Sequence, residues 1–214
     1  AGYGGSIPSR ISMNIQDYLS GKLKDSTSYE LTVEDEKLLK DFGIEEFIYK
    51  KLTSKKFRKW SIPKDVEERI MGVIRLKVKD NQPIEFRFPF GGYKLWRLPT
   101  TPEVDWAEFF MIVYYSQYLA PILKTYKPGV NLVFSSDDII VSRMDNIPQK
   151  NLDAYFNSFK SLLDCFRKYS PGNLKMEIIR IADLYPNKND FETDLKESIS
   201  QITEQSKSWD KIEW

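Results

Sequence analysis

Histidine is absent from this 214-residue sequence. Its absence excludes Ser-His and Cys-His nucleophilic sites, histidine general bases and the common histidine-containing zinc sites. Any proton transfer that the protein catalyses therefore runs through Asp, Glu, Lys, Tyr or water. We predict no cofactor and no metal site.

Cysteine and long apolar runs are almost as scarce. Cys165 is the single cysteine, which rules out an internal disulfide and fits a reducing cytoplasm. It lies in an amphipathic helical pattern, so we interpret it as a core residue. No apolar run approaches the ~20 residues of a membrane span, and no signal peptide is visible. We expect a cytoplasmic protein without membrane contact.

Neither sign of charge is in excess, because 32 basic side chains face 31 acidic ones for a net charge of +1. No global field would draw in nucleic acid, so such a partner would need a local patch. The run KKLTSKKFRKW (residues 50–60) is the one basic cluster. It is either the solvated end of a helix, where cations complement the dipole, or a phosphate or nucleic-acid contact.

Aromatic residues are plentiful, with 13 Phe, 12 Tyr and 5 Trp. They indicate either a rich core or a pocket for a flat apolar ligand. The length suits one domain, or a main domain with a small helical appendage. We divide the chain into an expected added leader (1–12, with Met13 as the natural start), a helical extension (13–60) and an α/β domain (61–214).

Hydrophobic periodicity predicts helices and strands in alternation. Helices are expected from Thr32 as N-cap to Gly43, from Gly43 onward, and from Pro63 to about Asn81. Later segments read as strands at 83–90, 131–136 and 174–186, and as helices at 104–126, 147–173 and 189–209, with Pro121 kinking or interrupting the first of these. Residues 137–145 (DDIIVSRMD) are predicted as a strand or a turn leading into one. This alternation predicts an α/β fold, with a Rossmann-like, mainly parallel sheet flanked by helices.

Three segments end predicted strands: FPFGGYKLWR, FSSDD and IADLYP. In a parallel sheet these ends meet at one edge, where ligands bind. Gly91 and Gly92 permit close backbone approach to an anion, and Arg87, Lys94 and Arg97 supply charge for it. The segment has neither P-loop nor GxGxxG spacing. A simple Gly-Gly turn with surface cations is the alternative.

Carboxylates follow at two places. Asp105 and Glu108 have capping-box spacing at a helix start, although a Glu there could instead receive a substrate amine. Asp137 and Asp138 are adjacent and, in an extended chain, would point to opposite faces. One of them could bind an amine, a sugar hydroxyl or a divalent cation, or both could belong to a turn.

A further pair, Asp145 and Asn146, is interpreted only as helix-entry chemistry, with either residue as the cap of the next helix.

The order of these features from Phe88 to Tyr155 resembles the isonitrile (isocyanide) synthase family, which includes the dityrosine and pyoverdine pathway enzymes. The resemblance rests on ordered motifs over about a third of the chain. They are FPFGGYKLWRLP with Lys94, PEVDWAE with Glu108, YKPG at 126–129, NLVFSSDD with Ser136 and Asp137, then Asp145 and Tyr155. The chain departs from the family at residues 90–93, where a lysine and a Ser-Pro-Asn run are replaced, and it is shorter than most members.

The resemblance implies an enzyme that converts the α-amine of an amino acid into an isonitrile, with the carbon taken from a pentulose phosphate. It assigns Lys94 to carbonyl or phosphate contact, with Arg87 and Arg97 beside it. It also assigns Asp137 and Glu108 to holding or deprotonating the amine. A lysine near other cations would have a lowered pKa, which suits Schiff-base chemistry.

Two other functions remain open from the residues alone. One is a non-catalytic α/β scaffold that uses Tyr93, Trp96 and Arg97 as a surface for a protein partner, since aromatics and Arg dominate binding hot spots. The other is an RNA- or nucleotide-handling protein that contacts phosphate through residues 50–60. The near-neutral net charge disfavours a nucleic-acid partner.

Overall fold

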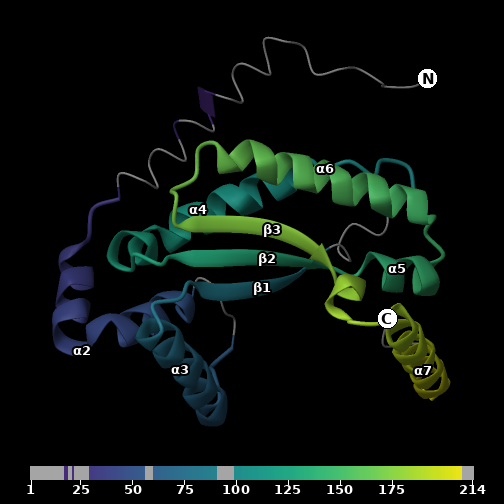
Figure 1. The fold of residues 1–214 in the computed structure, drawn as a ribbon, viewed down its shortest axis with the longest axis horizontal. Helices are drawn as coiled ribbons and strands as arrows, with labels where there is room; N and C mark the ends of the chain where they lie inside the picture. Colours follow the sequence, from purple (N-terminus) through teal and green to yellow (C-terminus); the bar gives the residue numbers. More distant parts are fainter. Residues whose placement is uncertain (1–16, 19–20, 22–28, 56–59, 91–98, 209–214) are drawn as a thin grey trace. The chain divides into compact units, whose positions relative to one another are not determined.

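The computed structural model describes residues 17–18, 21, 29–55, 60–90 and 99–208. Within these ranges the chain forms three strands that are separated in sequence by helices (Figure 1). They are α2 (Val33–Leu52), α3 (Lys64–Lys79), β1 (Ile84–Phe90), α4 (Trp106–Thr125), β2 (Val130–Ser136), α5 (Asp138–Asp145), α6 (Gln149–Arg167), β3 (Leu174–Arg180), the 3-10 helix η2 (Ile181–Leu184) and α7 (Lys188–Ser206).

The three strands form one parallel sheet in the order β1-β2-β3 (Figure 1). The predicted α/β class, with a parallel sheet and flanking helices, is therefore confirmed. The central strand β2 is apolar and buried along most of its length, as expected for a parallel strand covered on both faces. The outer strand β1 alternates instead and exposes Glu85, Arg87 and Pro89, residues that discourage pairing with a further strand.

Several predicted helix boundaries are confirmed. Thr32 caps α2 with a full capping box, in which its side chain accepts from the Asp35 amide. Pro63 immediately precedes α3, and Asn81 follows it at a φ of 52°. Gly43 marks a bend, because its φ of 81° and ψ of −178° divide α2 into two arms.

Two local predictions were wrong. Residues 138–145 form helix α5 rather than a strand, although they carry β-branched residues. Burial of Val141 in the packed helix outweighs intrinsic β preference over so short a segment. Asn146 ends α5 in the left-handed region at a φ of 55° instead of starting the next helix. Of the two effects expected of Pro121, an interruption is excluded, because α4 continues through it to Thr125.

The chain forms two compact units, and each strand contributes to both. Unit 1 comprises the described residues of Ala1–Phe86, Val104–Val133 and Ser161–Glu177, and unit 2 those of Arg87–Glu103, Phe134–Lys160 and Ile178–Trp214. The core of unit 1 includes the fully buried side chains of Phe47, Ile48, Ile112, Leu119, Ile122, Leu132 and Phe166. In unit 2 the core is aromatic and contains Phe90, Phe134, Tyr155 and Phe159.

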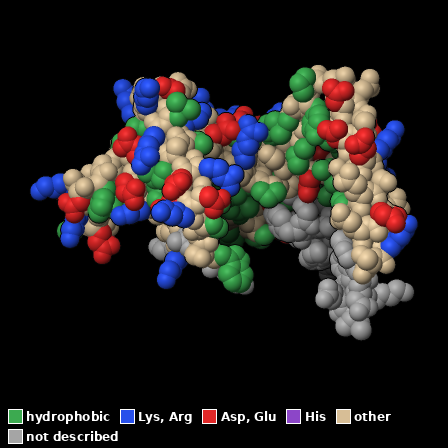
Figure 2. Space-filling view, turned by 90° about the horizontal axis from the view of Figure 1, so that it is seen from below, with side chains coloured by type: hydrophobic (Ala, Val, Ile, Leu, Met, Phe, Trp, Pro, Cys, Tyr) green, Lys and Arg blue, Asp and Glu red, His purple; other side chains and the backbone are tan. Residues whose placement is uncertain are grey.

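The surface mixes both signs of charge. On the face shown in Figure 2, Lys and Arg side chains are interspersed with Asp and Glu side chains. None of the helices in the described ranges combines the length and apolar character needed to cross a bilayer.

Candidate functional site

The carboxyl ends of all three strands lie in unit 2, at one edge of the parallel sheet. The strands end at Phe90, Ser136 and Arg180. The backbone amide of Asp137 donates to the Phe90 carbonyl at 3.4 Å, which joins the ends of β1 and β2 directly. The convergence predicted from the sequence is therefore present for the described strand ends. In open α/β sheets this edge is where ligands bind.

A charged network occupies this edge. Arg180, the last residue of β3, contacts Asp138 through Nε at 3.2 Å and Asp153 through Nη2 at 2.6 Å. Gln149 donates to both carboxylates, at 3.4 Å to Asp138 and 3.2 Å to Asp153. Phe156 lies beneath the guanidinium, 4.6 Å from its carbon to the ring centroid. One cation and two carboxylates are thus held by α5, α6 and β3 in a fixed arrangement.

The two carboxylates differ in burial and in the direction of their pKa shifts. Asp138 is only 4% exposed, and loss of solvation raises its pKa even though Arg180 acts in the opposite direction. For Asp153 the partial burial is outweighed by the hydrogen bonds from Arg180 and Gln149, so its pKa is lowered. The two neighbouring carboxyl groups therefore differ in how readily they bind a proton.

Aromatic side chains pack against one another next to this edge of the sheet. Phe90 at the end of β1 lies parallel to Tyr155, with ring centroids 5.4 Å apart and an interplanar angle of 3°. Phe159 lies 4.1 Å from Phe90 and 5.0 Å from Phe134 between ring centroids. Tyr155, a residue of the resemblance, is 3% exposed and belongs to this aromatic core. Close packing of these rings restricts the positions that the ends of β1 and β2 can take.

Two predicted site residues lie at this edge. Ser136 is the last residue of β2 and is buried, and Asp137 follows it as the half-buried N-cap residue of α5. The Asp137 side chain does not cap the helix. Arg87 is also in unit 2, on β1, with an exposed side chain. Ser136 and Asp137 therefore stay candidates for substrate contact.

Glu108 lies in unit 1 and is fully buried. Its carboxylate accepts from the backbone amide of Asp105 at 2.7 Å, and the Asp105 side chain accepts from the Ala107 amide at 2.7 Å. The predicted capping box is confirmed. A catalytic role for Glu108 stays a prediction.

The remaining predicted site residues fall in 91–98, which is outside the described residues. They are Gly91, Gly92, Tyr93, Lys94, Trp96 and Arg97. Their assignment to anion or partner binding stays a prediction. The side chain of Asp145 is likewise not described.

Sequence reasoning missed Gln149, Asp153 and Arg180. Arg180 could have been noticed, because a cation directly after the apolar run of β3 is placed at the same edge as Ser136 and Asp137. Asp153 gave no comparable indication, since an Asp on the polar side of an amphipathic helix is ordinary. Only the packing of α6 brings Asp153 to Arg180.

The network carries a formal charge of −1, from one guanidinium and two carboxylates. With Asp137 next in sequence, the edge suits a ligand that brings a positive charge, such as an ammonium group. Ser136 adds a hydroxyl that can donate or accept. The described residues contain no group of three His, Cys, Asp or Glu side chains arranged to hold a metal ion.

No protein-family model, curated protein or solved structure matches this chain.

Proposed function

We propose that the protein is an enzyme of small-molecule metabolism that binds an amine-bearing substrate at the carboxyl edge of a Rossmann-like sheet. The observation that carries this proposal is the network of Arg180, Asp138 and Asp153 beside Ser136 and Asp137. Of the three charged groups only Asp138 is almost fully buried, while Arg180 and Asp153 are partly exposed. A buried carboxylate is costly to desolvate even beside a cation, so its presence at a ligand-binding edge favours a functional reason for it.

Asp137 is the proposed amine-binding group, and it accepts the proton when the amine becomes a nucleophile. The Arg180 network is proposed to position the start of α5, which carries Asp137. Ser136 would hydrogen-bond the polar group next to the amine. In this scheme Asp138 acts through position and not through contact with the substrate, because its carboxylate is already bound by Arg180 and Gln149.

The resemblance to isonitrile synthases supplies the proposed reaction. The α-amine of an amino acid would take its isonitrile carbon from a pentulose phosphate, with Lys94 contacting the carbonyl or phosphate and Arg87 and Arg97 near it.

The test is a product assay on the full chain. The purified protein is incubated with the proteinogenic amino acids and a pentulose 5-phosphate, and products are trapped with a tetrazine and examined by mass spectrometry. We expect one amino acid to give a product that has gained one carbon and lost two hydrogens. Asp137→Asn and Lys94→Met should each lower its rate at least ~100-fold, as loss of a general base or nucleophile does.

The matched control is Asp65→Asn, which removes the same charge from an exposed position on α3. It should retain the parent rate. Full turnover in the Asp137→Asn and Lys94→Met variants would remove the proposed mechanism. If no amino acid gives an isonitrile, the reaction is wrong, although amine binding at the edge remains separately testable.

A further inference from the structure

The bend at Gly43 brings together two parts of α2 that a straight helix would hold far apart. Asp35 and Lys51 are 16 residues apart, a separation of ~24 Å along a continuous helix. In the structure their side chains form an ion pair. The two arms of α2 therefore fold toward each other, and α4 packs against them.

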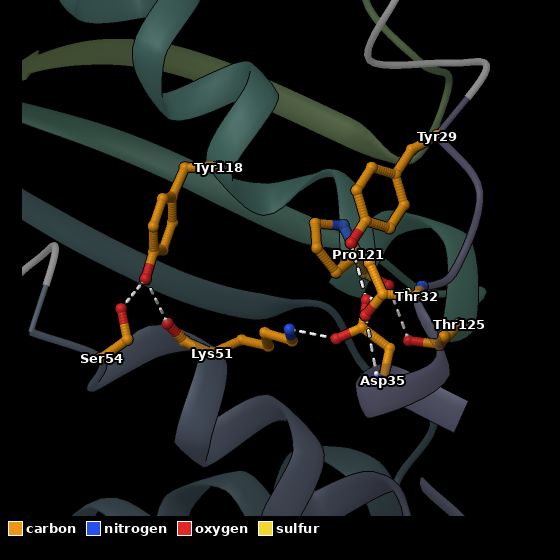
Figure 3. A network of polar contacts seen from close by, with 8 residues as sticks. All are labelled: Tyr29, Thr32, Asp35, Lys51, Ser54, Tyr118, Pro121 and Thr125. Carbon is orange, nitrogen blue, oxygen red and sulfur yellow. Dashed lines mark hydrogen bonds and ion pairs between the residues drawn. The ribbon is translucent and has the colours of Figure 1, made fainter. Parts of the chain in front are cut away.

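Asp35 is buried and held by several hydrogen bonds. It is 1% exposed and accepts hydrogen bonds from Tyr29 Oη at 2.6 Å and from the Thr32 amide at 3.2 Å (Figure 3). Burial opposes its ionisation, but the contacts with Lys51, Tyr29 and Thr32 prevail and lower its pKa to about 2. Asp35 thus remains a charged anchor that holds the Lys51 ammonium in place.

A second contact fixes the other end of Lys51. Tyr118 of α4 donates to the Lys51 carbonyl at 3.1 Å and shares a hydrogen bond with the Ser54 hydroxyl. Figure 3 shows Tyr118 pointing toward Ser54 and the Lys51 backbone, while the Lys51 side chain extends to Asp35. Both the backbone and the ammonium of Lys51 are therefore positioned.

Four of the residues just described, Tyr29, Lys51, Ser54 and Tyr118, line a cavity of about 330 Å³ within unit 1. Its described walls are Tyr29, Leu38, Lys50, Lys51, Ser54, Gln117, Tyr118 and Pro121. The volume falls in the range of small-molecule sites. The two ammonium groups and the Gln117 amide supply hydrogen-bond donors to the wall, while the hydroxyls of Tyr29 and Tyr118 already donate to Asp35 and to the Lys51 carbonyl.

We propose that this cavity is a binding site for a small anion that presents carboxylate or phosphate oxygens. Lys50 is the more exposed of the two cations. Its ammonium lies 3.9 Å from Glu46, a partly exposed i,i+4 partner that adds little, and 4.0 Å from the centroid of the Phe42 ring. Lys51 keeps two further N–H groups after pairing with Asp35, and Ser54 lies beside it. Charge-assisted bonds from ammonium groups to such oxygens are the strong ones.

The proposed site includes Lys50 and Lys51, the first two cations of the basic run at residues 50–60. A phosphate contact was one of the two interpretations of this run, and here two of its cations share a cavity instead of a flat surface. The inference does not rest on the proposed reaction, because all the residues of the cavity are in unit 1 and none is in the candidate site.

The experiment is a titration of the full chain with inorganic phosphate and with citrate at low ionic strength, by calorimetry and by amide NMR shifts. We expect saturable binding of at least one anion, with shifts at Lys50, Lys51 and Gln117. Lys50→Met should weaken it about tenfold or more, as loss of one charged hydrogen bond does. Lys51→Met is avoided because it would leave Asp35 buried without its cation.

Lys37→Met is the matched control, since Lys37 is exposed on the first arm of α2 and does not line the cavity. It should bind as the parent does. Binding of either probe with this pattern supports the site, and the preferred probe identifies the oxygen chemistry. Absence of saturable binding by both, or equal weakening in Lys37→Met and Lys50→Met, would overturn it.

Discussion

Asp35 shows how one side chain can hold a charge out of water. It has an opposite charge, a phenol and a backbone amide as partners, and these lower its pKa from 3.8 to about 2. The pKa of Tyr29 is raised to about 12, mainly by burial and then by its hydrogen bond to Asp35. In physical terms the folded protein binds the proton of Asp35 less readily than the unfolded chain does.

The expected consequence is a stability term that depends on pH. Because the folded-state pKa is below the unfolded one, the term is present above pH 3.8 and is lost as the pH falls toward 2. Its size is about 2 kcal/mol. Urea unfolding between pH 7 and pH 2.5, compared with Asp35→Asn, measures it.

The difference in unfolding free energy between the parent and Asp35→Asn should be constant from pH 7 to about 5 and shrink at lower pH. Asp65→Asn is the control, because it removes an exposed carboxylate of the same type. A difference that stays constant down to pH 2.5 would contradict the assignment.

At the scale of elements, α2 depends on one backbone conformation. Gly43 combines a φ of 81° with a ψ of −178°, a region that is essentially restricted to glycine. Among the described residues an added Cβ would meet only the Glu45 carboxylate, at 3.7 Å, so the cost of a side chain there is backbone strain. The bend places the second arm of α2, and with it Lys50 and Lys51.

Gly43→Ala should therefore destabilise the protein by ~1–3 kcal/mol. Gly72→Ala is the matched control: Gly72 is exposed within α3, has nothing within 4 Å of an added Cβ, and should gain up to ~1 kcal/mol from helix propensity. Urea unfolding of both variants measures the contrast. Equal stability of the two would show that Gly43 does not need its observed conformation.

Over the whole molecule, the elements that sequence analysis predicted correctly have long, regular patterns. The strand at 131–136 and the helices around 104–126 and 147–173 bury continuous or periodic apolar faces, which one sequence window is enough to recognise. The segment 137–145 failed because it is short and rich in β-branched residues, and its helical state depends on tertiary burial of Val141.

The candidate site was predictable to the same extent. Its location followed from parallel topology, so Ser136 and Asp137 were identified correctly as strand-end residues. The partners Gln149, Asp153 and Arg180 come from α6 and β3, and their meeting depends on contacts between distant segments. No local pattern encodes that meeting. The sequence predicts the bend of α2 in part, because Gly43 is expected to end a helix. It does not predict that Asp35 pairs with Lys51.

The central claim is that the carboxyl edge of the sheet binds an amine next to Asp137. Its most direct test is an amide NMR titration of the labelled full chain with a panel of amino acids and their N-acetyl derivatives. We predict saturable shifts at Ser136, Asp137, Asp138 and Arg180 with a free amino acid, none with its acetylated form, and loss of the shifts in Asp137→Asn. Equal shifts with the acetylated compound, or shifts confined to residues away from this edge, would contradict the claim.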